Sequence, residues 1–215
     1  KKMGAKENIL GRIRAAQRNP GAITADERAT VAARLRAQVE GPRPQQPDDA
    51  LAGFTACALK LSTTLDDVAS MADVPAAIAR YLDEHKLPKQ AVCWPDLAEL
   101  EWQAAGIEVE ARVAQGSDLV GITTAFCAIA ETGTLMTLSG PRTPAPSSLL
   151  PETHIAVVRK ARIVRSMEDA WKLLRLERGD SFMPRALNFI SGPSRTADIE
   201  QTLVLGAHGP YRVHI

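Results

Sequence analysis

The chain has 215 residues, of which 45% are hydrophobic and 24% are charged, as in an ordinary globular protein. Its 26 basic and 25 acidic residues leave a net charge of +1, which argues against nucleic acid or an anionic membrane surface as a partner. No apolar run approaches the ~20 residues that cross a bilayer, so we expect no membrane insertion. Residues 1–17 lack the apolar core of a signal peptide, and the three cysteines are far apart. We therefore expect a cytoplasmic protein without a disulfide framework or a metal site.

Residues 1–40 form a predicted helical arm. Ile9, Leu10 and Ile13 repeat at helical spacing, and the stretch from Thr24 to Glu27 fits a capping box ahead of a second helix. Residues 41–49 (GPRPQQPDD) contain three prolines and are polar, which predicts a linker. Two arrangements remain open for the arm: it is a small subdomain, or it packs on the main domain, residues 50–215.

Residues 50–215 alternate between helical and extended patterns. The predicted order is a helix at 51–61, a short strand at 63–69, a helix at 74–85, a strand at 90–94, a helix at 96–105, strands at 107–113 and 118–123, strand–turn–strand at 128–139, a strand at 154–158, a helix capped at 166–169, and strands at 187–190, 202–205 and 211–215. This alternation predicts an α/β protein with a mainly parallel sheet.

Glu131 stands alone inside the apolar stretch AIAETGTL. A buried carboxylate is costly unless it is paired or hydrogen-bonded. A partly buried carboxylate beside a glycine turn can act as a base, an acid or a nucleophile. The alternative is a structural carboxylate that is satisfied by neighbours, or a surface residue at the end of a turn.

The stretch SGPSRTADIE, residues 191–200, follows a predicted strand. Glycine and proline predict a turn, after which hydroxyls and Arg195 stand where a helix or helical turn would begin. Such a start suits a carboxylate or phosphate, and open α/β sheets bind ligands beyond the carboxyl ends of parallel strands. The alternative is an ordinary capped helix with Arg195 in a local ion pair.

Two further loops have a functional and a plain interpretation. His208 lies between two glycines, where a histidine can shuttle protons near neutral pH or can simply be a solvated turn residue. Residues 139–148 (SGPRTPAPSS) form a Pro/Ser-rich loop, which is either a lid or partner-docking loop or a plain connection.

Three blocks, AIAETGTL, SSLLPETHIAVV and ISGPSRTADIEQTLVLGAHGP, together resemble the lactate-utilisation (LUD) domain family, and within it the lactate utilisation protein C group. The resemblance covers roughly residues 50–215. It implies an open three-layer α/β/α sandwich like that of glucosamine-6-phosphate isomerase, ribose-5-phosphate isomerase and the CoA transferases. It also implies a place in a set of proteins that converts L-lactate to pyruvate. The iron–sulfur clusters are then on partner proteins, and no cofactor is expected on this chain.

The resemblance also implies a site. In this hypothesis Arg195 holds a small carboxylate or another anion, Glu131 or His208 moves a proton, and the SGPSRT turn supplies N–H donors. Many relatives carry an Asp where this chain has Phe126, so a role of that Asp would be absent or altered here. The motif positions implied to form the site are Glu131, Thr132, Gly133, Thr134, Ser191, Gly192, Ser194, Arg195, Thr196 and His208.

Three functions are consistent with these observations. The first is a component of an L-lactate oxidation system whose redox centres are on iron–sulfur partners, since the chain has no iron–sulfur, flavin or nicotinamide motif. The second is a stand-alone enzyme of the isomerase or CoA-transferase type, acting on a phosphosugar or acyl-CoA with Glu131 as base or nucleophile. The third is a non-catalytic assembly subunit that binds partners through the Pro-rich loop and the arm.

Overall fold

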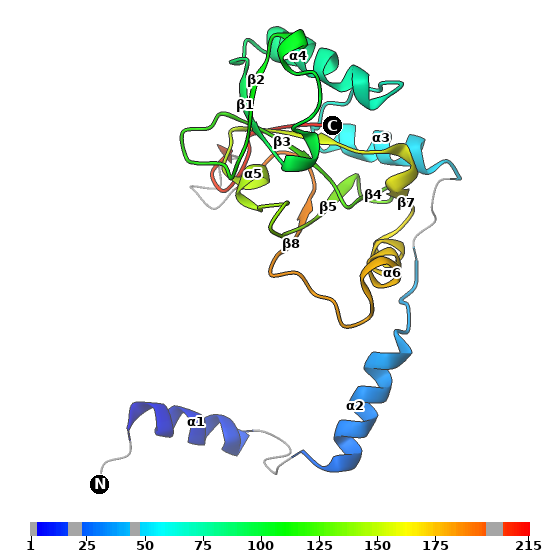
Figure 1. Cartoon of the computed structure of the whole chain (residues 1–215). Helices are drawn as coiled ribbons and strands as arrows, with labels where there is room; N and C mark the ends of the chain where they lie inside the picture. The colour runs from blue at the N-terminus through cyan, green and yellow to red at the C-terminus, as the bar shows by residue number, and fades with distance from the viewer. Residues whose placement is uncertain (1–3, 17–22, 44–47, 197–203) are drawn as a thin grey trace. The chain divides into compact units, whose positions relative to one another are not determined.

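The computed structural model describes residues 4–16, 23–43, 48–196 and 204–215 (Figure 1). The chain divides into two compact units, Lys1–Arg43 and Pro44–Ile215, and each is described by itself. In the described residues, no helix has both the length and the apolar character that crossing a bilayer requires.

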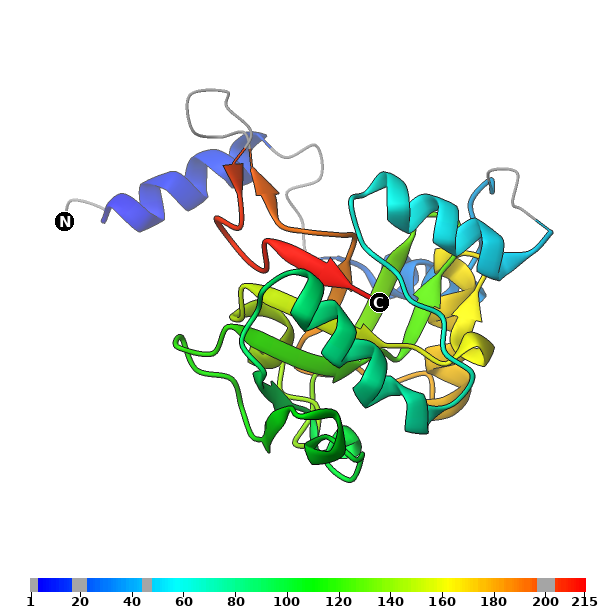
Figure 2. The same ribbon diagram turned by 90° about the horizontal axis from the view of Figure 1, so that it is seen from above.

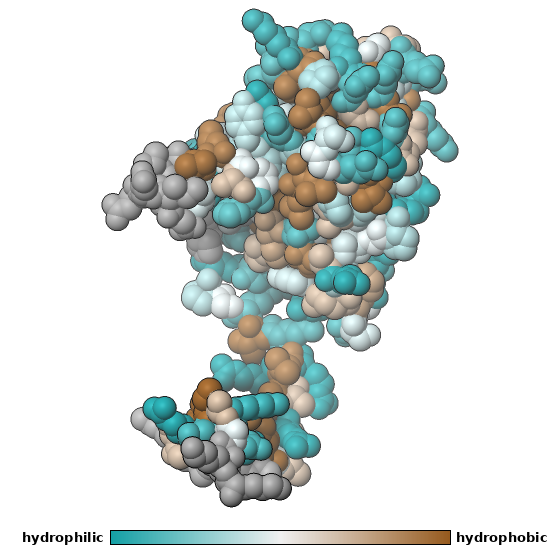
Figure 3. Space-filling model, turned by 90° about the vertical axis from the view of Figure 1, so that its left-hand side faces the viewer, coloured by the Kyte–Doolittle hydropathy of each residue, from teal (hydrophilic) through white to brown (hydrophobic). Residues whose placement is uncertain are grey.

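The first unit contains two helices, α1 (Ala5–Ala16) and α2 (Ala25–Ala37). The predicted capping box is confirmed: the Glu27 backbone N–H donates to Thr24 Oγ1 at 3.2 Å, and the Thr24 N–H donates to the Glu27 carboxylate at 2.8 Å. No residue of either helix is buried, and Figure 3 shows apolar side chains on the surface of this unit. The sequence of each helix, including the capping box, therefore sets these helices, because the described residues of this unit bury no side chain.

The second unit is built on a five-stranded sheet in which every pair is parallel. The predicted α/β class with a mainly parallel sheet is thus confirmed. The strands β3 (Val120–Thr124) and β6 (Thr153–Val157) are buried along almost their full length, as expected for the interior of a parallel sheet covered on both faces. The order is β11 (Arg212–His214), β6 (Thr153–Val157), β3 (Val120–Thr124), β1 (Gln90–Cys93) and β2 (Glu108–Ala111).

A second sheet of four strands carries the predicted strand–turn–strand unit. The strands β4 and β5 pair antiparallel, with Ala128 opposite Leu135, and β5 is buried throughout. The order in this sheet is β7 (Ile163–Val164), β4 (Cys127–Ile129), β5 (Thr134–Leu138) and β8 (Leu187–Ile190).

Helices cover both faces of the parallel sheet (Figures 1 and 2). The helix α4 (Val74–Glu84) packs on one face of β3, whereas α5 (Pro146–Leu149) lies against the other face of β3 and against β6. The helix α6 (Met167–Arg178) packs on β4. The helix α3 (Ala50–Lys60) places Phe54 and Ala58 in a core that includes Leu135 of the second sheet and Ala156 of the first.

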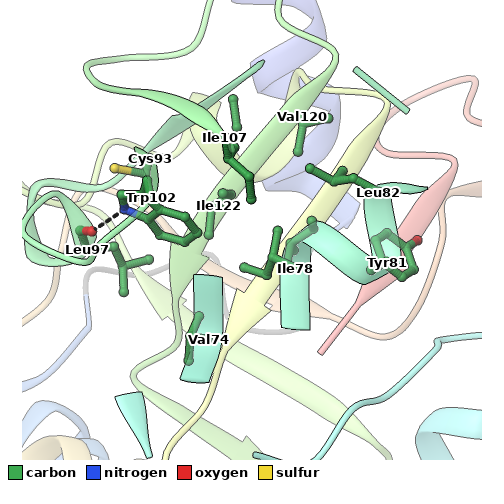
Figure 4. Packing of buried hydrophobic residues seen from close by; sticks show 12 residues of the cluster. Val74, Ile78, Tyr81, Leu82, Cys93, Leu97, Trp102, Ile107, Val120 and Ile122 are labelled. Atoms are coloured by element: carbon green, nitrogen blue, oxygen red, sulfur yellow. Dashed lines mark hydrogen bonds between the residues drawn. The ribbon is translucent and has the colours of Figure 1, made fainter. Parts of the chain in front are cut away.

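Figure 4 shows the largest core cluster, between α4 and the parallel sheet. Ile78 and Leu82 of α4 are buried against Val120 and Ile122 of β3. The indole of Trp102 lies in the same cluster, and its N–H donates to the Leu97 carbonyl at 2.7 Å. Removing these apolar surfaces from water is the main favourable contribution to the stability of this layer.

Two predicted elements are wrong or much reduced. The helix at 96–105 is replaced by two short 3-10 turns, Pro95–Leu97 and Gln103–Ala105. Both Leu97 and Trp102 enter the core, and a straight α-helix would point residues five positions apart in different directions. The strand at 63–69 is reduced to a bridge between Thr64 and His214, extended by the bond from the Asp66 N–H to the Ile215 carbonyl at 2.9 Å.

Candidate functional site

The turn Glu131–Thr134 connects β4 to β5 and presses against α3. Gly133 has φ +64°, a conformation that side chains rarely adopt. A Cβ at this position would lie 2.4 Å from the backbone nitrogen of Ala58. The Cys57 thiol also lies 3.6 Å from the Glu131 carbonyl. The glycine of the ETGT turn therefore allows the turn to approach the backbone of α3 closely.

The Glu131 carboxylate is half-buried and lies at the start of α6. It accepts the backbone N–H of Met167, the first residue of that helix, at 2.8 Å. Ser166 is the N-cap and accepts the N–H of Asp169, as predicted. A negative charge is favourable at a helix N-terminus because the backbone N–H groups there have no intrahelical acceptor. This geometry supports the structural interpretation of Glu131.

The SGPSRT stretch does not begin a helix in the described residues, so that prediction is wrong. Arg195 and Thr196 form β9 (Arg195–Thr196), which pairs antiparallel with β10 (Val204–Leu205). The preceding strand β8 is antiparallel to β5, so the stretch does not follow a parallel strand either. The predicted strand at 202–205 is described only over β10, and the motif positions Asp198 and Glu200 lie outside the described residues.

Gly192 and Arg195 both contact the carboxyl end of α3. Gly192 has φ +80°, and a Cβ there would lie 2.6 Å from the carbonyl oxygen of Leu61. The Arg195 guanidinium is exposed and donates to that same carbonyl at 3.0 Å and to the hydroxyl of Ser62. A cation is favourable here because the last carbonyls of a helix are unpaired and carry the negative end of its dipole.

Hydroxyl groups join the motif blocks to one another. Thr134 Oγ1 lies 2.8 Å from Ser191 Oγ, and it also donates to the Thr132 carbonyl at 3.4 Å. Ser194 Oγ accepts the backbone N–H of His208 at 3.3 Å, and the Ser194 N–H donates to the Pro210 carbonyl at 2.8 Å.

The side chain of His208 is exposed, whereas Thr196 is buried. The structure therefore brings the ETGT turn, the SGPSRT stretch and the HGP loop together around the end of α3. We call this region, Glu131–Thr134 with residues 191–196 and 206–210, the motif cluster.

Phe126 stands where many relatives are expected to carry an Asp. Its ring lies 4.7 Å below the guanidinium carbon of Arg162, and its carbonyl accepts from Arg162 Nε at 2.8 Å. The same guanidinium is paired with Glu177. An aromatic face is a favourable partner for a cation, so Phe126 holds Arg162 together with the Glu177 carboxylate.

Two of the three cysteines are unreactive thiols of the core. Cys93 and Cys127 are buried, and burial raises the pKa of Cys93 to about 11 and that of Cys127 to about 12. Both thiols are therefore protonated at neutral pH, whereas metal ligands and nucleophiles are thiolates. Across residues 4–16, 23–43, 48–196 and 204–215, no group of three or more His, Cys, Asp or Glu side chains is placed to hold a metal ion.

A cavity of about 710 Å³ lies between α3 and α4, at the carboxyl ends of β6 and β11. In the described structure none of the ten predicted site positions lines it. The sequence does contain one signal for it: a buried strand, HIAVV, is followed directly by Arg159 and Lys160. Charged residues after a parallel strand indicate the edge of the sheet where ligands bind.

The sequence and the structure of this chain are similar to those of known proteins. The LUD domain family model matches residues 60–215. The chain is 41% identical over 113 residues to lactate utilization protein C of Exiguobacterium sp., covering 52% of this chain and 49% of that protein. It is 39% identical over 113 residues to lactate utilization protein C of Bacillus subtilis, covering 52% and 47%. The chain thus spans about half the length of the curated relatives it matches.

A solved structure has the same fold. The crystal structure of a DUF162 family protein from Deinococcus radiodurans matches with a TM-score of 0.58 and 23% sequence identity. The match covers 80% of this chain and 97% of that chain.

Proposed function

The chain belongs to the LUD domain family, and from this premise we propose that it acts in cytoplasmic lactate utilisation, as one component of a multi-protein system that oxidises L-lactate to pyruvate. The observation that carries the proposal is the identity of about 40% to curated relatives named lactate utilization protein C. The LUD domain model, which matches residues 60–215, covers the ETGT turn, the SGPSRT stretch and the HGP loop.

The redox centres of the proposed system are on iron–sulfur partner proteins. Oxidation of lactate to pyruvate removes two electrons and two protons, and an acceptor must take the electrons. Two of the three thiols of this chain are buried and protonated at neutral pH, which disfavours them as cluster ligands. This supports a substrate-handling or supporting role for the chain within the system.

In this role the motif cluster would hold a small carboxylate or another anion. The Arg195 guanidinium uses one nitrogen, Nη2, for the end of α3, and its other N–H groups have no acceptor among the described residues. The exposed His208 is held through Ser194, one residue before Arg195 in the sequence. We therefore assign substrate binding to Arg195 and proton transfer to His208. Glu131, which caps α6, supports the fold of the site.

The proposal is tested by lactate-dependent reduction of an artificial electron acceptor. The purified chain, the iron–sulfur partners and the combination are assayed separately. The combination alone should reduce the dye, and Arg195→Gln should remove most of that activity while Arg185→Gln, at an exposed position outside the motif cluster, leaves it unchanged. Dye reduction by the partners without this chain would overturn the proposal.

One observation favours a second candidate, a non-catalytic assembly subunit. The motif residues Thr134, Ser191 and Ser194 bond to one another or to the chain's own backbone, and Phe126 replaces a carboxylate expected at that position. This candidate predicts that dye reduction requires the chain but survives both Arg195→Gln and His208→Gln.

A further inference from the structure

The cavity between α3 and α4 lies apart from the motif cluster. In Figures 1 and 2 the carboxyl terminus of the chain emerges between these two helices, where β11 ends. The lining residues come from α3, α4, β6, residues 65–71, residues 158–161 and 163, and the chain end at 214–215. The cavity is therefore beyond the carboxyl ends of two parallel strands, the position at which open α/β sheets hold ligands.

The size of the cavity excludes a close fit to lactate. About 710 Å³ corresponds to roughly twenty water molecules at ~30 Å³ each. Lactate has six non-hydrogen atoms, counted from its formula, and would leave most of this space filled with water. The volume lies instead within the range of about 300–1,000 Å³ that is typical of sites for larger organic ligands.

The walls of the cavity are mainly apolar. Phe54 of α3, Val74 and Ile78 of α4 and Ile155 of β6 all line it. A ligand that buries an apolar body against these side chains gains free energy in proportion to the apolar surface removed from water. A small, highly charged ligand would gain nothing from them and would lose part of its hydration.

The charges at the edge of the cavity leave one cation without a partner. Asp66 is paired with Arg80 at 3.4 Å, and Asp67 is paired with Lys160 at 2.7 Å. Arg159 lines the cavity and is exposed, and its guanidinium has no hydrogen bond or ion pair to any described residue. Of the charged side chains described at this edge, the Arg159 guanidinium is therefore the one available to pair with an anionic group.

His214 supplies a neutral polar group inside the cavity. Its Nδ1 lies 2.8 Å from Thr64 Oγ1, and its ring stacks on Tyr81 at 3.9 Å between centroids. Burial lowers the pKa of His214 to about 4, so the imidazole is uncharged at neutral pH. Among the described lining residues, the Arg159 guanidinium is therefore the only charged side chain without a partner.

We propose that this cavity binds an amphipathic carboxylate larger than lactate, with its apolar chain or ring between α3 and α4 and its carboxylate on Arg159. This inference does not rest on the proposed function, because it concerns a different site and a different ligand. A guanidinium holds a carboxylate through two parallel N–H donors, so the proposal selects a carboxylate over a neutral head group of the same length.

The test uses the full chain with decanoate as the probe. Decanoate binding is measured by isothermal titration calorimetry, with 1-decanol and decyltrimethylammonium as neutral and cationic ligands of equal chain length. Displacement of the fluorescent sulfonate 1-anilinonaphthalene-8-sulfonate gives a second readout. Decanoate should bind most tightly. Arg159→Gln should weaken decanoate binding at least about ten-fold, because the charged hydrogen bonds to the carboxylate are lost, and should leave decanol binding unchanged. Arg185→Gln is the matched control and should change neither.

Thr55→Trp tests the location, because Thr55 is a half-buried lining residue on α3 and an indole would occupy the cavity. It should abolish decanoate binding and dye fluorescence while the far-ultraviolet circular dichroism stays unchanged. The proposal is overturned if decanoate does not bind at millimolar concentration, if decanol binds equally well, or if a folded Thr55→Trp variant retains binding. If Thr55→Trp does not fold, Arg159→Gln decides: an unchanged decanoate affinity rejects the site.

Discussion

The hydroxyl of Thr134 lies 2.8 Å from the hydroxyl of Ser191, although 57 positions separate the two residues. The contact joins the start of β5 to the residue that follows β8. The Thr134 side chain is buried, whereas Ser191 is exposed. Loss of the contact therefore leaves Ser191 Oγ open to water, and Thr134 Oγ1 keeps only its longer bond to the Thr132 carbonyl at 3.4 Å.

Removing this pair should show coupling between the two residues. We expect Thr134→Val and Ser191→Ala each to lower the free energy of unfolding by about 1 kcal/mol, because each removes the hydrogen bond between the two hydroxyls. The double variant should cost about 1 kcal/mol less than the sum. Urea unfolding of the four proteins gives the coupling energy, and strict additivity would show that the bond contributes nothing.

Gly133→Ala should destabilise the protein by several kcal/mol or prevent folding. The alanine would have to adopt a positive φ, and its Cβ would lie 2.4 Å from the backbone nitrogen of Ala58 on α3. Gly106→Ala is the matched control, since Gly106 has φ +73° but nothing within 4 Å of a Cβ. It should cost only about 1–2 kcal/mol. Thermal melts distinguish the two, and equal losses would mean that the contact with α3 does not matter.

Glu131→Ala should lower stability by about 1–2 kcal/mol, because the Met167 N–H at the start of α6 loses its acceptor. Glu131→Gln keeps an acceptor and loses only the charge, so it should cost about 0.5 kcal/mol. If Glu131 is structural, lactate-dependent dye reduction at a temperature where both variants are folded should remain near that of the parent. A large loss of activity in Glu131→Gln at unchanged stability would instead indicate a catalytic role.

The protein should lose stability as the pH falls from about 6.5 toward 4. Burial lowers the pKa of His154 and of His214 to about 4, whereas an unfolded histidine titrates near 6.5. In this range the unfolded state binds more protons, so acid favours unfolding. Each histidine should cost roughly 2 kcal/mol by pH 5. His154→Gln should reduce the difference in urea midpoint between pH 7.5 and pH 5, and a midpoint independent of pH would contradict the assignment.

Only one of the three thiols should react in the native protein. Cys93 and Cys127 are buried and have raised pKa values, whereas Cys57 is only half-buried. Titration with a chromogenic disulfide reagent should therefore show one reactive thiol before unfolding and three in denaturant. Replacing Cys57 by Ser should remove the native reaction, and a residual reaction would show that a buried thiol becomes accessible.

The elements that were predicted well are those defined by local signals. The helix α6 begins at Ser166 and α4 has Pro75 in its first turn, and both boundaries follow from capping chemistry and helical spacing. The strand β6 is a short apolar run, a pattern that is typical of a buried parallel strand. In these segments the local preference and the fold agree.

The elements that were missed depend on contacts between distant segments. Residues 96–105 break into short turns because Leu97 and Trp102 must both reach the core. The end of the SGPSRT stretch, Arg195 and Thr196, becomes a strand because Val204 and Leu205 pair with it. The cavity is formed by several segments that are distant in the sequence, and none of them carries a recognisable binding motif. Only the charged residues after β6 indicate where the cavity lies.

The pairing of Thr64 and Asp66 with the last strand has a consequence for the order of folding. The Thr64 N–H donates to the Val213 carbonyl, and the Ile215 N–H donates to the Thr64 carbonyl. These contacts join positions separated by about 150 residues, and long-range contacts form slowly because a large loop must close first. During synthesis the apolar residues of α3 and α4 therefore emerge from the ribosome long before β11 exists to complete the wall between them. A nascent chain of this protein would depend on chaperones most strongly in that interval.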